Sequence, residues 1–403
     1  MHIETRAIHD GQDKDPSTGA TIPPIYLSST YTQSAPGKHQ GYDYSRSNNP
    51  TRENLEHCLA SLESGEAAAS FASGLAACSA VFDLLRPGDG VVASHDLYGG
   101  TFRLLDKVLR PLGIEVAFAA DANAESYARA VQSLRKPRMI WIETPTNPLL
   151  DILDISLLSR LAAAHQLLLI VDNTFASPYL QRPIESGADF VVHSTTKYLG
   201  GHSDVVGGAV IARNKELLEP IRFIQNARGA VPGPFDCYLT HRGLKTLAVR
   251  MKQHSENALA LAQFLQDHAQ VQSVFYPGLK DHPGHDLAAR QMKHYGGMLS
   301  IVLQGGYEAA EVFCRSLRVF SLAESLGGVE SLCCHPASMT HASIPRDIRE
   351  KRGIHDGLIR LSVGIEHVED LLFDVDQALH AVAVSKRSAT GVELQATPVP
   401  AIE

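Results

Sequence analysis

The sequence predicts an α/β fold, with a mostly parallel sheet covered by helices on both faces and a smaller C-terminal α+β domain. Two patterns predict it. Between 66 and 213, short apolar runs of strand length alternate with stretches of helical length, as in repeated βα units. After 241, a long amphipathic pattern leads into a second, shorter set of strands and helices. At 403 residues, the chain is long enough for two or more domains.

The composition narrows the class of protein. Apolar residues make up 44% of the chain and charged residues 20%, as in ordinary soluble enzymes. The net charge of −8 argues against a nucleic-acid partner. Residues 1–15 are charged, without the apolar core of a signal peptide, and apolar runs such as 167–171 are too short to cross a membrane. Six cysteines without a CxxC pair fit a reducing, cytoplasmic setting.

The chain begins with its least periodic part, residues 1–45, which we expect to form an arm. A helix with leucines on one face follows Asn49 and Pro50. Tyr44 and Arg46 lie two residues apart in the irregular stretch before it. A phenol and a guanidinium in a loop either contact an anion or lie on the surface without a special role.

The elements that follow can be assigned in order from their apolar periodicity and the Gly, Pro and Asp residues between them. We expect strands at 67–73, 90–95, 114–119, 139–143, 167–173, 188–194 and 207–212. We expect helices between them at 75–85, 101–113, 126–134 and 155–165, and Gly113 should end the second of these. The later part should contain a helix over 241–268, strands at 298–305 and 358–364, and helices at 309–317 and 368–382. This order predicts an α/β domain over 46–240, an α+β domain over 241–385 and a mobile tail over 386–403.

Lys197 is the leading candidate for a catalytic residue. It follows the expected strand 188–194, so it should lie in a loop at the carboxyl end of the sheet, where ligands bind in open α/β folds. Ser194 and Thr196 supply hydroxyls before it, and two glycine pairs follow. A desolvated lysine amine becomes a nucleophile that can form a Schiff base. The alternative is an ordinary solvated surface charge.

Two further strand ends carry polar candidates. Asp172 ends the strand 167–173, and a carboxylate there either caps a turn or, if the cofactor is pyridoxal phosphate, keeps the pyridine nitrogen protonated. The turn Ser73-Gly74-Leu75 joins a strand to a helix, whose first N–H groups suit a phosphate. The sequence has no GxGxxG, so a dinucleotide site lacks its fingerprint.

Three more side chains fit a planar cofactor and an amino-acid substrate. Tyr98 follows a strand, where its ring can lie over a cofactor, and Asn147 lies between prolines at 145 and 148. Arg360 lies in an apolar strand, where a guanidinium needs an anionic partner such as a substrate carboxylate. The histidines of 281–286 and the residues Cys333, Cys334 and His335 lack zinc spacing and are better explained by turns and packing, so we expect no metal.

Nine motifs occur in the order YSRSNNPTR, SGLAA, DLYGGT, ETPTNP, DNTF, STTKYLGGHSDVVGG, AESLGGVES, MTHASIP and LIRLSVG. Through them the chain resembles the Cys/Met-metabolism family of pyridoxal-phosphate enzymes, from about Thr5 to His380. Within the family it is most similar to cystathionine γ-lyases, notably over 229–251. The resemblance implies the pyridoxal-phosphate-dependent transferase fold, fold type I, with pyridoxal phosphate as cofactor. It also implies an assembly of at least a dimer, usually a tetramer of two dimers.

The resemblance assigns a role to each cofactor-binding candidate. Lys197 would hold the cofactor covalently and move protons, and Asp172 would pair with its pyridine nitrogen. The phosphate would be bound by Ser194, Thr196 and the backbone of Gly74 and Leu75, completed by Tyr44 and Arg46 of a neighbouring subunit. Tyr98 would stack on the ring and take part in catalysis, and Asn147 would lie near the phenolic oxygen of the cofactor and close to the substrate.

The resemblance also implies a sulfur amino acid as substrate. Arg360, with the backbone around Ser325, would bind its α-carboxylate. Glu324 and Asp43 would suit a distal ammonium group, and Arg103 a distal carboxylate. The implied reaction is γ-elimination of L-cystathionine to cysteine, 2-oxobutanoate and ammonia.

Other activities of the same family stay open at this stage. They are cystathionine γ-synthase, which replaces the γ substituent of an acylhomoserine with cysteine, cystathionine β-lyase, and a sulfhydrylase of broad specificity. Gly100 stands where methionine γ-lyases carry a cysteine, which disfavours that activity. A non-catalytic protein with the same fold is a further alternative, but every chemically required residue is present.

Overall fold

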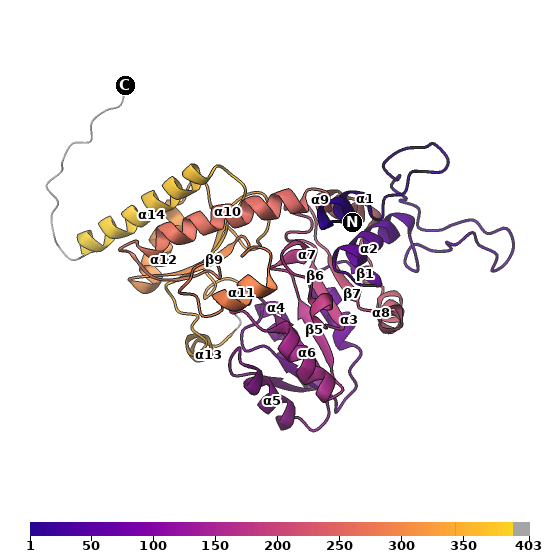
Figure 1. Ribbon diagram of the computed structural model, residues 1–403, viewed down its shortest axis with the longest axis horizontal. Coiled ribbons are helices and arrows are strands. Elements are labelled where there is room, and N and C mark those ends of the chain that lie inside the picture. The colour runs from indigo at the N-terminus through magenta and orange to yellow at the C-terminus, as the bar shows by residue number, and fades with distance from the viewer. Residues whose placement is uncertain (343, 390–403) are drawn as a thin grey trace.

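The computed structural model describes residues 1–342 and 344–389. Two sheets lie side by side, each with its own helices (Figure 1). Within the described residues the larger sheet has seven strands in the order β1-β7-β6-β5-β4-β2-β3, and the smaller has five in the order β10-β11-β12-β9-β8. This arrangement confirms the predicted α/β fold with a smaller C-terminal sheet domain.

The strands of the large sheet match the apolar runs of the sequence. They are β1 (Ala67–Phe71), β2 (Gly90–Ala93), β3 (Glu115–Phe118), β4 (Pro137–Glu143), β5 (Leu168–Asp172), β6 (Phe190–Ser194) and β7 (Gly208–Ala212). Strands β2 to β6 pair in parallel, and only β7 is antiparallel to its neighbours β1 and β6. Because parallel strands end at the same edge, β4, β5 and β6 place their last residues together there.

Helices cover both faces of this sheet. On β4, Trp141 packs with Phe82 of α3 (Gly74–Phe82), their ring centroids 4.6 Å apart, in a cluster that also includes α8 (Lys215–Arg228). Ile140 and Ile142 point to the opposite face, toward α5 (Ala124–Ser133) and α6 (Ile155–Ala164). The period-two alternation of β-strand side chains therefore fills two core layers.

The C-terminal domain is built on an antiparallel sheet. Its strands are β8 (Val271–Phe275), β9 (Met298–Leu303), β10 (Ser321–Leu322), β11 (Leu332–Cys334) and β12 (Leu358–Ser362), with only β10 and β11 parallel. Helices α12 (Gly306–Ser316), α14 (Val368–Ala389) and α10 (Leu247–Gln266) pack against it, and α11 (His285–Gln291) and α13 (Arg346–Lys351) are short. Figure 1 shows α10 reaching from this domain toward α9 and the N-terminal helices.

Three sequence predictions differ from the structure. The helix expected over 241–268 is two helices, α9 (Pro234–Leu244) and α10, so the expected domain boundary at 240/241 falls inside α9. The helix expected over 101–113 changes from α4 (Gly99–Arg103) through a π turn at 104–109 to a 3-10 turn, and ends at Gly113 with φ 85° as predicted. A 3-10 turn (Pro183–Ser186) and the short α7 (Ser177–Leu180) also escaped the sequence analysis.

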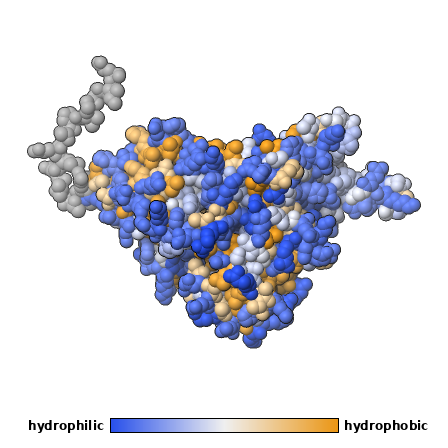
Figure 2. All heavy atoms as spheres, viewed as in Figure 1, coloured by the Kyte–Doolittle hydropathy of each residue, from blue (hydrophilic) through white to orange (hydrophobic). Residues whose placement is uncertain are grey.

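The termini also differ in part from expectation. The arm contains a helix, α1 (Ile3–His9), before α2 (Pro50–Leu62). Residues 10–49 between them project from the body in irregular loops (Figure 1), and the projection is largely hydrophilic or neutral (Figure 2). Helix α14 continues to residue 389, so the expected tail is helical at 386–389, and its remainder lies outside the described residues. No helix among the described residues is long and apolar enough to span a membrane.

Candidate active site

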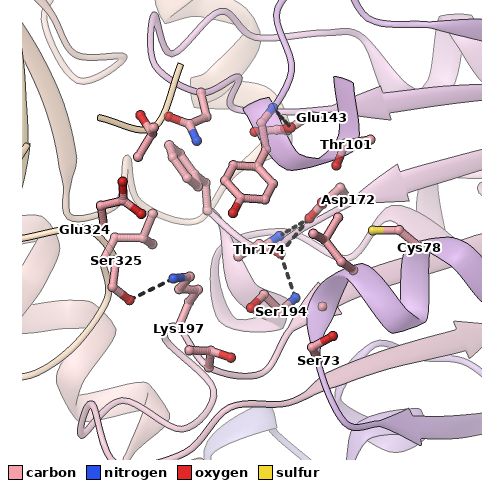
Figure 3. Close-up of a pocket in the computed structure, with 18 of the residues that line it drawn as sticks. Ser73, Cys78, Thr101, Glu143, Asp172, Thr174, Ser194, Lys197, Glu324 and Ser325 are labelled. Carbon is pink, nitrogen blue, oxygen red and sulfur yellow. Dashed lines mark hydrogen bonds between the residues drawn. The ribbon is translucent and has the colours of Figure 1, made fainter. Parts of the chain in front are cut away.

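A cavity of about 370 Å³ opens at the carboxyl ends of β4, β5 and β6 (Figure 3). The second sheet closes one side of it. Eleven predicted site residues line this cavity: Gly74, Leu75, Tyr98, Asn147, Asp172, Ser194, Thr196, Lys197, Glu324, Ser325 and Arg360. Ser73, which belongs to the predicted turn before Gly74, also lines it. Eight other lining residues were not predicted from the sequence: Cys78, Thr101, Glu143, Thr174, Phe175, Val206, Leu326 and Thr340.

Lys197 lies three residues after β6 and points into the cavity (Figure 3). Its Nζ donates a hydrogen bond to Ser325 Oγ at 2.7 Å. Removal from bulk water, together with the positive charge of Arg360, lowers the pKa of the Lys197 amine to about 8. A substantial fraction of the amine is therefore neutral at mildly alkaline pH, the form that acts as a nucleophile or a base.

Ser325 holds this wall of the cavity in an unusual backbone conformation, with φ 98°. A non-glycine residue is strained there and persists only when its surroundings fix it. Its hydroxyl accepts from Lys197, and its carbonyl accepts from Arg360 Nη2 at 3.0 Å. The strained residue thus brings together an amine from the first domain and a guanidinium from the second.

Asp172 faces the same cavity and is held by Thr174. The Oδ1 atom of Asp172 accepts from Thr174 Oγ1 at 2.6 Å and from Thr174 N at 3.1 Å, while Thr174 Oγ1 accepts from the N–H of Ser194 at 2.9 Å. Burial raises the pKa of Asp172, and the bonds from Thr174 oppose the rise. No lysine or arginine among the described residues forms an ion pair with this carboxyl.

Glu143 is the most informative of the missed residues. It pairs with Asp172 across β4 and β5, is 4% exposed, and accepts the N–H of Tyr98 at 2.9 Å. Burial and the neighbouring charge of Asp172 raise the pKa of Glu143 well above its usual value. Two such carboxyls do not both ionise easily. Repulsion from Asp172 favours the protonated form of Glu143, whereas the hydrogen bonds from Thr174 favour the charged form of Asp172.

The turn before α3 forms a cradle at the opposite end of the cavity from Glu324. Ser73 caps the helix, with its Oγ accepting from the N–H of Ala76 at 3.1 Å. A Cβ on Gly74 would lie 2.8 Å from Cβ of Ser194, so only glycine allows this approach. The start of α3 and Ser194 line the cavity and offer backbone N–H groups and a hydroxyl, a donor set suited to a phosphate. Thr196 also lines the cavity, and its Oγ1 donates to the Gly207 carbonyl at 3.3 Å and accepts from Gly207 N at 3.0 Å.

Arg360 extends from β12 into the cavity and is 2% exposed. Its Nη1 donates to Asn147 Oδ1 at 2.9 Å, and its Nη2 to the Ser325 carbonyl. Its Nε is buried and has no partner among the described residues. Both partners of this buried guanidinium are neutral, so its positive charge favours an anion such as a carboxylate in the cavity.

Four predicted site residues do not line this cavity. Tyr44 is 46% exposed, and Arg46 donates from Nε to Asn226 Oδ1 at 3.1 Å, both on the arm. Asp43 is exposed and accepts the N–H of Tyr44 at 2.7 Å. Arg103 is exposed on α4, near enough to Tyr98 for its charge to oppose the rise that burial gives the pKa of that phenol. A single chain therefore does not unite these four with Lys197.

A nucleophilic lysine, a chargeable aspartate and a phosphate cradle at the ends of parallel strands define a pyridoxal-phosphate enzyme. The chain belongs to the Cys/Met metabolism PLP-dependent enzyme family, whose sequence profile matches residues 4–380. Pyridoxal phosphate is the cofactor of this family, and the residues of the cavity fit it: Asp172 offers the carboxylate without an ion pair that the pyridine nitrogen needs, and the turn at Gly74 offers the cradle.

Relatives of the chain carry three different names. It is 54% identical to a cystathionine gamma-synthase of Mycobacterium tuberculosis, covering 93% of this chain and 96% of that protein. It is 52% identical to a cystathionine gamma-lyase of Bacillus subtilis, with coverages of 95% and 100%, and 50% identical to a cystathionine beta-lyase of Coxiella burnetii, with coverages of 94% and 98%. A crystal structure of cystathionine gamma synthase from Xanthomonas oryzae in complex with cystathionine superposes with a TM-score of 0.93 at 47% identity, covering 96% and 99% of the two chains.

Proposed function

We propose that this protein cleaves L-cystathionine by γ-elimination, giving cysteine, 2-oxobutanoate and ammonia. The observation that carries the proposal is the pair of charges on the wall formed by the C-terminal domain. Arg360 is buried with neutral hydrogen-bond partners, and Glu324, next to Ser325, is exposed at the same cavity. An α-carboxylate on Arg360 leaves a distal ammonium group free to reach Glu324, and cystathionine carries both groups.

The residues of the chain perform the proton transfers. Bound pyridoxal phosphate supplies an electron sink that stabilises negative charge at the substrate α-carbon. Arg360 and Asn147 orient the substrate, and the neutral amine of Lys197 takes the α-proton. Asp172 holds the proton on the pyridine nitrogen. Once Lys197 has passed on the α-proton, its amine would remove a proton from the β-carbon, and the γ carbon–sulfur bond would then break. The leaving cysteine thiolate would take up a proton, and water would hydrolyse the remaining four-carbon fragment to 2-oxobutanoate and ammonia.

Cystathionine γ-synthase is the second candidate, and the mycobacterial relatives at 54% identity favour it. It uses the same cavity chemistry but replaces the γ substituent of an acylhomoserine with cysteine. Cleavage at the β-carbon is a third candidate reaction, because relatives from Coxiella burnetii and Lactococcus lactis are named cystathionine beta-lyase. Only the products separate these three reactions.

Product analysis tests the proposal. The protein is given L-cystathionine alone in one reaction, and O-succinylhomoserine with cysteine in another, with Lys197→Ala as the inactive control. We expect cysteine and 2-oxobutanoate from the first reaction. Homocysteine and pyruvate would establish β-cleavage instead, and cystathionine formed only in the second reaction would establish the γ-synthase.

We also propose that the arm completes the phosphate site of a neighbouring subunit. Tyr44 and Arg46 do not line the cavity of their own chain: Tyr44 is 46% exposed, and Arg46 is hydrogen-bonded to Asn226 of α8. Arg46→Ala chains, inactive by weak cofactor binding, can be mixed during refolding with Lys197→Ala chains. Mixed assemblies should regain activity, because the intact Lys197 site then receives an intact arm. Mixtures as inactive as their parents would contradict the shared site.

A further inference from the structure

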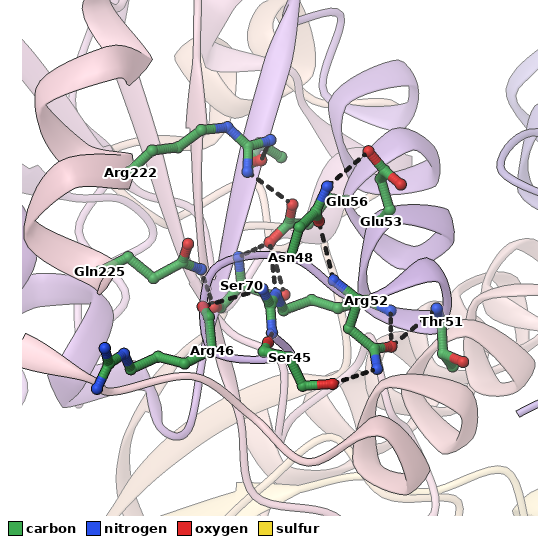
Figure 4. A network of polar contacts seen from close by, with 12 residues as sticks. Ser45, Arg46, Asn48, Thr51, Arg52, Glu53, Glu56, Ser70, Arg222 and Gln225 are labelled. Carbon is green, nitrogen blue, oxygen red and sulfur yellow. Dashed lines mark hydrogen bonds and ion pairs between the residues drawn. The ribbon is translucent and has the colours of Figure 1, made fainter. Parts of the chain in front are cut away.

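Arg52 and Glu56 are buried charges that the cavity chemistry does not use. They lie one turn apart on α2, with side chains 3% and 1% exposed, and Nε of Arg52 is 3.8 Å from Oε1 of Glu56. Buried charges are costly unless they are paired and hydrogen-bonded. Figure 4 shows the polar contacts of both side chains: Glu56 contacts the sheet, and Arg52 contacts the segment around Ser45 and Arg46.

The Glu56 side of this network fixes β1, an edge strand of the large sheet. Glu56 Oε1 accepts from Ser70 N at 2.8 Å and from Ser70 Oγ at 3.0 Å, and Gln225 Nε2 donates to the Ser70 carbonyl at 2.6 Å. An edge strand has unpaired backbone groups on its outer side, and here α2 and α8 satisfy them with side chains. Ser70 is three residues before Ser73, which begins the cradle.

Arg222, on α8, also binds the Glu56 carboxylate. Its Nη1 donates to Glu56 Oε2 at 3.1 Å, and its Nη2 donates to the carbonyl of Ala68 in β1 at 2.8 Å. One carboxylate therefore lies between two guanidinium groups, and every partner on the sheet side belongs to the strand that enters the cradle.

The Arg52 side of the network fixes the arm. Arg52 Nη1 donates to the carbonyl of Ser45 at 2.6 Å, and Nη2 donates to the carbonyl of Arg46 at 3.2 Å. These carbonyls belong to the segment that carries Tyr44 and Arg46. Replacing the Arg52 guanidinium would remove the hydrogen bonds to the carbonyls of Ser45 and Arg46.

We propose that Arg52 and Glu56 are positioning residues for the cofactor phosphate. They join the strand that leads into the cradle of their own subunit to the segment that carries Tyr44 and Arg46 to the phosphate site of the neighbouring subunit, although neither residue lines the cavity. This inference rests on the cofactor site and on the role of the arm given under Proposed function.

Two substitutions test it through cofactor affinity. Arg52→Met removes both carbonyl contacts at similar side-chain length, and Glu56→Gln keeps an acceptor for Ser70 but removes the charge. Titration of cofactor-free protein with pyridoxal phosphate should give a dissociation constant about tenfold higher in each variant, the effect of losing a charge-assisted hydrogen bond. The rise in Tm on adding the cofactor should shrink, because ligand stabilisation falls as Kd rises.

Two further variants serve as controls. Arg228→Met removes an ion pair with Asp83 from the same helix α8 without touching β1 or the arm, and its Kd should stay within about twofold of wild type, as for an exposed pair. Arg52→Lys keeps the charge beside Glu56 but loses the paired donors, so its Kd should lie between those of wild type and Arg52→Met.

The outcomes are distinct. A purely structural role would lower the Tm of cofactor-free and loaded protein equally and leave Kd unchanged in both Arg52→Met and Glu56→Gln, which would overturn the proposal. Arg52→Met removes the contacts to the arm, and Glu56→Gln removes the charge that faces the sheet. If only one of the two variants folds, its Kd for pyridoxal phosphate still tests the proposal. Failure of the cofactor site itself would be seen in the wild type, as no rise in Tm with pyridoxal phosphate.

Discussion

At the scale of single residues, the proposed chemistry depends on the lowered pKa of the Lys197 amine. Its amine has one hydrogen-bond acceptor, Ser325 Oγ at 2.7 Å, and the guanidinium of Arg360 opposes a second positive charge nearby. Desolvation and this repulsion together lower its pKa to about 8. The exposed carboxylate of Glu324 acts in the opposite direction and limits the shift.

We predict that cofactor-free protein takes up pyridoxal phosphate faster as pH rises, with a plateau above the lowered pKa. Only the neutral amine reacts, so below about pH 8 the rate should fall about tenfold per pH unit. Rapid-mixing absorbance measurements across this range test the prediction. A break near the usual lysine pKa would show that Lys197 is not desolvated, and Ser325→Ala should move the break because the amine loses its hydrogen-bond partner.

At the scale of elements, strand ends explain what the sequence could predict. Asp172, Ser194 and Lys197 were predicted because each follows an apolar strand whose carboxyl end is plain in the sequence. Glu143 also ends a predicted strand, yet its importance depends on the pairing of β4 with β5. That pairing and the contact of Thr174 with Ser194 both depend on how neighbouring strands are aligned. Local sequence patterns do not specify this alignment.

Helix boundaries were predicted less well, for reasons that are also tertiary. The periodic stretch 241–268 reads as one helix because its apolar pattern does not stop. In the structure a Cβ on Gly243 would lie 2.2 Å from the carbonyl oxygen of Gly200, and Arg250 donates to the Gly243 carbonyl at 2.8 Å. The end of α9 is therefore set by close packing against the loop after Lys197, which is distant in sequence.

The turn between β1 and α3 provides a prediction at this scale. Gly74→Ala places a Cβ 2.8 Å from Cβ and 3.1 Å from Cα of Ser194, so the turn must move away from β6. We expect cofactor affinity to fall by about tenfold or more, because a displaced helix N-terminus loses its aligned N–H donors. Equilibrium dialysis against pyridoxal phosphate measures this.

At the scale of the whole molecule, the cavity exists because two sheets meet. Arg360 of β12 contacts Asn147, 213 residues earlier in the chain, and Ser325 contacts Lys197 across 128 residues. Composition and periodicity predicted two domains but not their contact. The motif resemblance, rather than the apolar pattern, placed Arg360, Ser325 and Glu324 in one site.

Arg360→Lys tests this junction. The lysine keeps the positive charge but cannot bond Asn147 and Ser325 while presenting a further donor to a substrate carboxylate. We expect KM for the amino-acid substrate to rise at least about tenfold, with cofactor affinity nearly unchanged, since one charge-assisted hydrogen bond is lost. Steady-state kinetics with a parallel cofactor titration separates the two quantities. A large loss of cofactor affinity with unchanged KM would place Arg360 in the cofactor site instead.

Covalent attachment of pyridoxal phosphate to Lys197, which we propose from the cavity, is tested by trapping that bond. Loaded protein is reduced with borohydride, digested, and mapped by mass spectrometry, with Lys197→Ala as the matched control. We expect one phosphopyridoxyl group, on the peptide containing Lys197, and none in the control. A label on another lysine, or equal labelling of Lys197→Ala, would contradict it.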